Sequence, residues 1–313
     1  MDAILNDIRD NLGFTIISSE PIPGGFMNTL IKLVCDTGTY LLKIYSRVRF
    51  SDKKLQKIED ALSIQRQLKS RGVKTAAIIP IEGKNVRILP CGSAYSLMSF
   101  ISGRNETYET INKRQLQSLG SELSLIHMEM EKLTEKDMLL PDNSASIINS
   151  LWDNYKKRCE GFTPDMPKDY IETVKNQKVV LETLSPNRIQ KLKRQLCHED
   201  FTFDNILFDG DHVGAVIDFD RTQVSYPLHD VGRALLSFAL KDNELLPDRI
   251  EAFKKGYNEQ LPLTDNDIKD AFMITWCIET LWWITPEFFM GTRGKADRFR
   301  KEIMWLTFNL DKI

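Results

Sequence analysis

The sequence has few cysteines and no cysteine pair at a metal-binding or redox spacing. Its five cysteines are widely spread over 313 residues, and none forms a CxxC pair. An odd number at such spacing argues against a disulfide framework and against a structural zinc site. A reducing compartment such as the cytoplasm is therefore the expected location.

The sequence also has no excess of positive charge, no long apolar run and no internal repeat. Its net charge is -2 and its pI is about 6.2, whereas nucleic-acid binding needs a concentrated basic surface. No apolar stretch reaches the roughly 18 residues that cross a bilayer. The acidic, amphipathic start MDAILNDIRDNLGF is unlike a secretory signal. We therefore expect a soluble monomer or homodimer that binds neither nucleic acid nor membranes.

The hydrophobic pattern changes from mixed to mainly helical near residue 100. It predicts a helix at 2–12, strands at NTLIKLVC and TYLLKIY, a helix from KKLQK to SRGV, and strands at TAAIIPI, NVRILP and AYSLMSFI. Beyond it, helices are expected at 116–133 and within 145–196 and 228–313. Only the short strands NILF and VGAVIDF interrupt them. We expect an α+β fold with a sheet lobe at 1–98, a hinge at 99–103 and a larger helical lobe at 104–313.

The stretch HEDFTFDNILFDGDHVGAVIDFD, residues 198–220, carries the strongest chemical signal. Asp218 ends a buried strand, where a carboxylate is costly to desolvate unless a cation or donors compensate it. The hairpin brings Asn205 and Asp218 close together, and amide and carboxylate oxygens are the ligands that Mg²⁺ prefers. Asp200, on the adjoining loop, is near enough to orient a hydroxyl group and accept its proton.

This stretch resembles the catalytic and metal loops of the aminoglycoside phosphotransferase and choline kinase family. That family carries H-G-D-x-x-x-x-N followed by I-D-[FW]-[DE]. The resemblance implies a bilobal, protein-kinase-like fold and transfer of the γ-phosphate of ATP, with Mg²⁺, to the hydroxyl of a small molecule. It implies that Asp200 is the catalytic base, that Asn205 and Asp218 are metal ligands, and that His198 and Asp220 support the two loops.

The same resemblance assigns phosphate binding to the first strands. Gly24, Gly25 and Asn28 match the short GGxxN form of the phosphate loop, where glycines let the backbone approach phosphates. Lys43, in the hydrophobic strand TYLLKIY, is expected to reach the α- and β-phosphates. The alternative is a strand lysine whose ammonium lies in solvent.

Two further assignments concern the partner of that lysine and the adenine. An acid on the following helix is expected to hold Lys43, either Glu59 or, less favoured, Asp60. The segment YSLMSFISG resembles the family's hinge, so backbone groups from Ser99 to Ile101 are expected to pair with adenine. Backbone recognition leaves ATP and GTP both open.

The acceptor side departs from the family pattern at one residue. Glu199 replaces the usual glycine, and it either favours a positively charged acceptor or points into solvent. In WCIETLWWI, Glu279 lies between Trp276 and Trp283 at helical spacing. They either receive an ammonium or are core tryptophans around an acid. Asp230, in YPLHDVGRALLSF, is expected to cap its helix.

Other functions stay open at this stage. A protein kinase is disfavoured, because Glu199 also replaces its arginine and only 11 residues separate Asp218 from Asp230. A catalytically inactive, kinase-like nucleotide-binding module is one alternative. The other is a metal-dependent hydrolase that uses His198, Asp200, His212 and Asp218. Candidate acceptors are an aminoglycoside-like antibiotic, homoserine, choline and an amino sugar.

Overall fold

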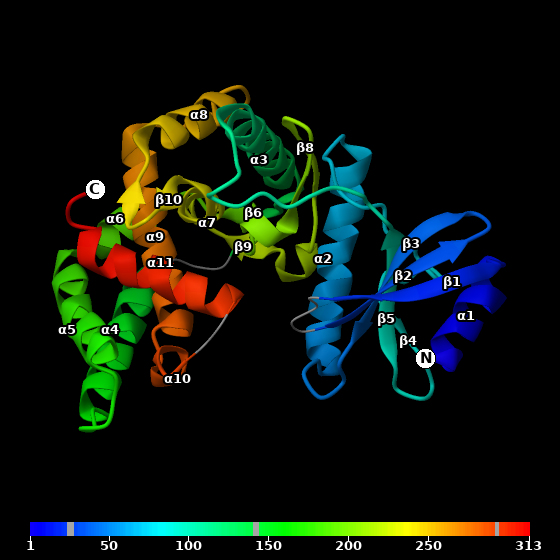
Figure 1. The fold of residues 1–313 in the computed structure, drawn as a ribbon, viewed down its shortest axis with the longest axis horizontal. Helices are drawn as coiled ribbons and strands as arrows, with labels where there is room; N and C mark the ends of the chain where they lie inside the picture. The colour runs from blue at the N-terminus through cyan, green and yellow to red at the C-terminus, as the bar shows by residue number, and fades with distance from the viewer. Residues whose placement is uncertain (24–27, 140–143, 292–293) are drawn as a thin grey trace. The chain divides into compact units, whose positions relative to one another are not determined.

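The computed structural model describes residues 1–23, 28–139, 144–291 and 294–313. By internal packing they form two units, Met1–Glu106 with Asp204–Gln223 and Thr107–Phe203 with Val224–Ile313 (Figure 1). Residues 204–223, expected in the helical lobe at 104–313, pack with the first unit. The hinge at 99–103 stays a prediction. In the part of the chain that is described, no helix is both long and apolar enough to span a membrane.

The first unit is built on a five-stranded antiparallel sheet in the order β1-β2-β3-β5-β4, which confirms the expected α+β class. Its elements are α1 (Asp2–Leu12), β1 (Ile16–Ile22), β2 (Asn28–Cys35), β3 (Gly38–Tyr45), α2 (Asp52–Ser70), β4 (Arg87–Ile88) and β5 (Ala94–Ser99). The strand expected at TAAIIPI is wrong, because Ile78 and Ile81 form only isolated bridges there. β1 was not predicted, because IISSEPI lacks a clear alternation of apolar and polar residues.

The two helices of this unit cover opposite faces of the sheet. Leu42 and Leu97 pack in the cluster that contains residues of α1, whereas Tyr45 and Met98 pack in the cluster that contains residues of α2 (Figure 1). Because side chains alternate along a strand, Lys43 shares the face of Tyr45. The sheet therefore directs this lysine toward the α2 side.

A short hairpin from the middle of the chain completes the first unit. It consists of β7 (Ile206–Asp209) and β8 (His212–Val216), preceded by η2 (Phe203–Asn205) and followed by η3 (Phe219–Arg221). The Phe208 N–H donates to the carbonyl of Arg104 at 2.8 Å, and the Val216 N–H donates to the carbonyl of Lys74 at 2.8 Å. These backbone bonds join the hairpin to the chain on either side of β5.

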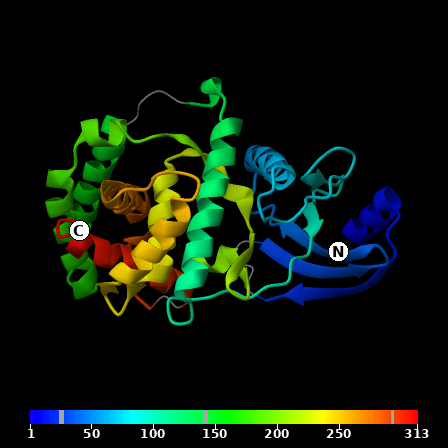
Figure 2. The same cartoon turned by 90° about the horizontal axis from the view of Figure 1, so that it is seen from above.

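The second unit is mainly helical, as expected. Its elements are α3 (Lys113–Leu133), η1 (Lys136–Met138), α4 (Ser144–Glu160), α5 (Lys168–Thr183), α6 (Pro186–Gln190), β6 (Gln195–Cys197), β9 (Gln223–Ser225), α7 (Pro227–Ala239), β10 (Leu240–Lys241), β11 (Glu244–Leu245), α8 (Pro247–Tyr257), α9 (Asp265–Trp283), α10 (Pro286–Phe289) and α11 (Lys295–Asn309). The long helix α3 packs along α8 (Figure 2). α7 packs closely against α9, so that a Cβ on Gly232 would lie 2.6 Å from the Ala271 carbonyl oxygen.

Candidate functional site

Lys43 in the first unit is held by two carboxylates. Its ammonium lies 2.7 Å from Oδ1 of Asp218 and 2.8 Å from Oδ2 of Asp220, and its side chain is 5% exposed. Burial alone would lower the pKa of Lys43, but the two negative charges raise it well above its usual value. The alternative of a strand lysine with its ammonium in solvent is therefore wrong.

Glu59 does not pair with Lys43 in this structure, which corrects our expectation. Its carboxylate accepts the Asn85 N–H at 3.1 Å and the Val86 N–H at 2.6 Å, so it fastens α2 to the segment before β4. The acids that hold Lys43 come instead from the segment after β8. Sequence reasoning missed these two acids because they lie about 175 residues from Lys43 in the sequence. Their place in the metal-binding motif also gave them a role that did not involve a lysine.

The predicted metal ligands lie at one end of the hairpin. Asn205 immediately precedes β7, Asp218 follows β8, and the Ile217 N–H donates to the Asn205 carbonyl at 2.9 Å. Asp218 adopts a left-handed backbone (φ 64°), and its side chain is 41% exposed, so it can reach a ligand. Burial, with the Asp218 charge adding to it, raises the pKa of Asp220 to about 6.

This donor set fits a magnesium ion. Two carboxylates and an amide offer only oxygen atoms, which suit a hard divalent cation. His212, which a hydrolase would need as a further ligand, pairs with Asp209 at the other end of the hairpin. That position argues against the hydrolase.

The remaining nucleotide assignments have mixed outcomes. Gly24 and Gly25 lie outside the described residues. Asn28 faces Tyr45 across β2 and β3, on the face of Lys43, and its buried Oδ1 has no hydrogen-bond partner among the described residues. In the expected hinge, the Ser99 N–H is used by the Ala77 carbonyl at 2.8 Å, so it is not available to adenine.

The hinge therefore has fewer available donors than expected. The Phe100 N–H also donates within the protein, to the Thr39 carbonyl at 3.0 Å. For Ile101, no backbone hydrogen bond is formed within the described part of the chain. Of the three backbone N–H groups assigned to adenine, that of Ile101 is the one without a backbone partner in the described part of the chain.

Asp230 in the second unit holds the loop that carries Asp200. Its two carboxylate oxygens accept the His198 N–H at 2.8 Å and the Glu199 N–H at 2.9 Å, and its side chain is fully buried. Burial would raise its pKa, but the hydrogen bond from His127 and nearby positive charge lower it. This corrects the expected helix cap, because the N-cap of α7 is Tyr226 and Asp230 bonds a different segment.

The loop is also braced from within. The Asp200 N–H donates to Nδ1 of His198 at 3.2 Å, and the His198 ring lies edge-on to Phe201 at 5.7 Å between centroids. His198 is fully buried. These contacts set the direction of the backbone at Asp200, the predicted catalytic base.

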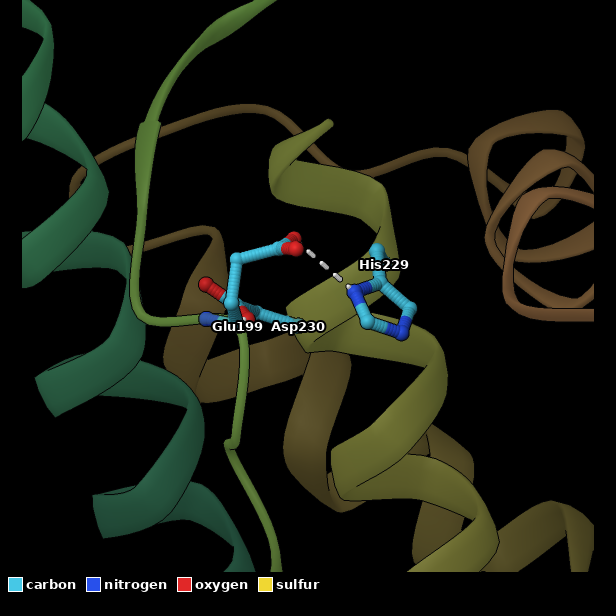
Figure 3. A group of neighbouring side chains, drawn as sticks. All are labelled: Glu199, His229 and Asp230. Atoms are coloured by element: carbon cyan, nitrogen blue, oxygen red, sulfur yellow. Dashed lines mark hydrogen bonds and ion pairs between the residues drawn. The ribbon is translucent and has the colours of Figure 1, made fainter. Parts of the chain in front are cut away.

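Glu199 neither points into solvent nor offers an unused charge to a ligand. It is buried, and its Oε1 lies 3.1 Å from Nδ1 of His229 (Figure 3). The other ring nitrogen of His229 lies 3.1 Å from Oε1 of Glu279. Glu279 also accepts a hydrogen bond from the Trp283 indole. Both expected acceptor acids are therefore occupied by groups of the protein itself.

The tryptophans on α9 have different environments. Trp276 is fully buried and donates its indole N–H to Thr307 at 2.9 Å, so it belongs to the core.

Sequence reasoning missed His229 and Arg233. Arg233 is also fully buried, and it forms an ion pair with Glu302 at 3.1 Å. The segment YPLHDVGRALLSF contains both, but separations of 30 and 50 residues carry no local signal for their partners.

Comparison with known proteins identifies the family of this chain. Residues 18–263 match the sequence profile of the phosphotransferase enzyme family. Homoserine kinase of Zymomonas mobilis subsp. mobilis is 24% identical over 264 residues, covering 83% of this chain and 77% of that protein. Homoserine kinase of Parvibaculum lavamentivorans is 25% identical over 259 residues, covering 81% and 75%.

Solved structures show the same fold at lower identity. Spectinomycin phosphotransferase in complex with ADP and spectinomycin aligns over 100% of this chain and 98% of its own, with a TM-score of 0.62 and 16% identity. A microcompartment-associated aminopropanol kinase aligns over 100% and 97%, with a TM-score of 0.61 and 12% identity. The fold and the site define a small-molecule kinase. The chain belongs to the phosphotransferase enzyme family.

Proposed function

We propose that the protein transfers the γ-phosphate of ATP to the hydroxyl of a small, amine-bearing alcohol, with homoserine as the first acceptor to test. The observation that carries the nucleotide half is the ion pairing of the buried Lys43 with Asp218 and Asp220. The acceptor rests on the curated homoserine kinases, which are 21–25% identical to this chain. The charges of Glu199 and Glu279 no longer support it, because His229 already occupies them.

In this proposal each residue has one task. Lys43 contacts the phosphates, and the amide of Asn28 lies beside it on the same face of the sheet. Asn205 and Asp218 would hold Mg²⁺, with Asp220 in support. When bound, Mg²⁺ would neutralise negative charge on the phosphate oxygens.

The acceptor half depends on Asp200. As a general base it accepts the proton of the acceptor hydroxyl and orients that oxygen toward the phosphorus atom. Asp230 holds the backbone of the two preceding residues, and the His198 ring accepts the Asp200 N–H. Proximity and charge neutralisation therefore supply most of the proposed rate acceleration.

The test is a comparison of acceptors with purified protein, ATP and Mg²⁺. Homoserine, choline, an aminoglycoside and an amino sugar are each supplied, with ADP release and the mass of the phosphorylated product as readouts. GTP replaces ATP in a parallel series, and EDTA should abolish turnover. We expect ADP release that depends on the acceptor, and highest with homoserine.

Asp200→Asn is the decisive variant, with Asp209→Asn on the exposed hairpin as its matched control. We expect the first to lower kcat about 10²–10⁴-fold and the second to leave it unchanged. Failure of every acceptor, with ATP still bound in calorimetry, would favour the inactive nucleotide-binding module.

A further inference from the structure

His229 lies between two buried carboxylates from two other segments of the second unit. Glu199 belongs to the loop after β6, His229 to the first turn of α7 and Glu279 to α9. The side chains are 1%, 6% and 10% exposed for His229, Glu199 and Glu279 respectively. Each ring nitrogen lies 3.1 Å from a different carboxylate (Figure 3 draws the Glu199 contact).

This geometry requires a doubly protonated ring. A neutral imidazole has one N–H, so it would turn a lone pair toward one of the two carboxylates. An imidazolium donates to both, and buried charges are stable when paired in this way. Burial lowers the pKa of His229, but Glu199 and Glu279 raise it to about 10.

Other charged groups surround the ring. Asp230 follows it on α7, and Arg233, one turn further along α7, lowers the pKa of Glu279, which falls to about 2 despite burial. Oxygen and nitrogen atoms of Glu199, His229 and Asp230 lie within 4.8 Å of one another, the spacing of a metal site. Within the protein, the Glu199 carboxylate already binds the His229 ring and the Asp230 carboxylate already accepts two backbone N–H groups, so these contacts account for the cluster.

Glu199 needs this support because its backbone is left-handed, with φ 66°. Such a conformation is strained for a residue other than glycine. Asp230 holds the Glu199 N–H and His229 holds the Glu199 carboxylate. Asp200 is the next residue, so the contacts that hold Glu199 also constrain the backbone that leads into Asp200.

We propose that His229 is a positioning residue that, as an imidazolium, joins the loop carrying Asp200 to helix α9 and so fixes the direction of Asp200. The inference rests on the proposed function, in which Asp200 is the base. It also means that the cation beside Glu199 and Glu279 is part of the protein and is not the acceptor's amine.

The charge state is tested by NMR of the full-length protein labelled with ¹⁵N-histidine. The chain has four histidines, so the signal missing from His229→Gln identifies the residue. We expect that signal to remain that of an imidazolium at pH 8.5, and to titrate at lower pH in Glu279→Gln. A neutral ring at pH 8.5 in the unaltered protein would overturn the proposal.

The positioning role is tested by hydrogen exchange and by kinetics. In His229→Gln, the amides of residues 198–200 should exchange faster and kcat should fall about tenfold to a hundredfold. His212→Gln, on the exposed hairpin, is the matched control. The KM for ATP should stay within about twofold, because the proposed nucleotide ligands belong to the first unit.

A pH profile separates positioning from a general structural role. A raised pKa makes the protonated ring persist as pH rises, until about 10 in the unaltered protein. Glu279→Gln is a milder change, and it keeps the test open if His229→Gln does not fold. In this variant the pKa of His229 should be lower than in the unaltered protein, so kcat should fall as pH rises through that lower value. An unchanged profile together with unchanged amide exchange would refute the role. If no acceptor is phosphorylated, the proposed function fails, while NMR and amide exchange still decide the inference.

Discussion

Replacing Asp230 with asparagine tests how the loop of Asp200 is held. The carboxylate is fully buried and accepts the N–H groups of His198 and Glu199 at 2.8 and 2.9 Å. Asparagine has the same shape but no charge, and its NH₂ group must face one of these two donors. One bond is therefore weakened and one N–H is left unsatisfied.

The expected loss follows from those two changes. A hydrogen bond to a charged group contributes about 1.5–3 kcal/mol, and an unsatisfied buried donor costs about 1–3 kcal/mol. We expect Asp230→Asn to lower the free energy of unfolding by about 3 kcal/mol. Denaturant unfolding followed by circular dichroism measures it. Asp267→Asn, in the capping box of α9, is the matched control and should cost about 1 kcal/mol or less.

The effect should depend on pH in a defined direction. The pKa of Asp230 is lowered in the folded protein. Its contribution to stability is therefore complete above the unfolded value of about 3.9 and is lost as pH falls through the lower folded value. The difference between Asp230→Asn and the unaltered protein should shrink in that acid range. A difference under about 0.5 kcal/mol at pH 7 would refute the reasoning.

Two further predictions concern other parts of the fold. Lys43→Met removes the cation between two carboxylates, and kcat/KM for ATP should fall about 10²–10³-fold in initial-rate assays; a fall under about threefold would contradict phosphate anchoring. Gly232→Ala puts a Cβ 2.1 Å from Oγ1 of Thr275 and 2.6 Å from the Ala271 carbonyl, so α7 and α9 must separate. It should lower the unfolding free energy by about 1–3 kcal/mol, unlike Gly161→Ala, whose nearest contact is 3.4 Å.

Local periodicity identified most elements correctly. The stripe at 2–12 forms α1, the strands around DTG form β2 and β3, and the long apolar stripe forms α3. The hairpin of β7 and β8 also lies where the short runs NILF and VGAVIDF, joined by a turn, placed it. Strand prediction failed at TAAIIPI and at β1, because strand pairing depends on neighbours that a local pattern does not contain.

Pairings over long separations could not be predicted. Nothing local shows that Lys43 meets acids about 175 residues later, or that Asp230 accepts hydrogen bonds from a loop 31 and 32 residues before it. For Glu199 the expectation of a ligand cation was reasonable from charge alone. Only the packing of α7 against α9 supplies His229 as that cation.

The residues of HEDFTFDN and IDFD indicated the class of chemistry, because they resemble the catalytic and metal loops of a kinase family in which a base, an amide and a carboxylate serve phosphoryl transfer. They also determined that a hairpin separates the amide from the carboxylate. The tertiary structure alone decided which of these charges have partners within the protein. Ion pairs depend on distances of a few ångströms, and those distances are set by packing between segments far apart in the sequence.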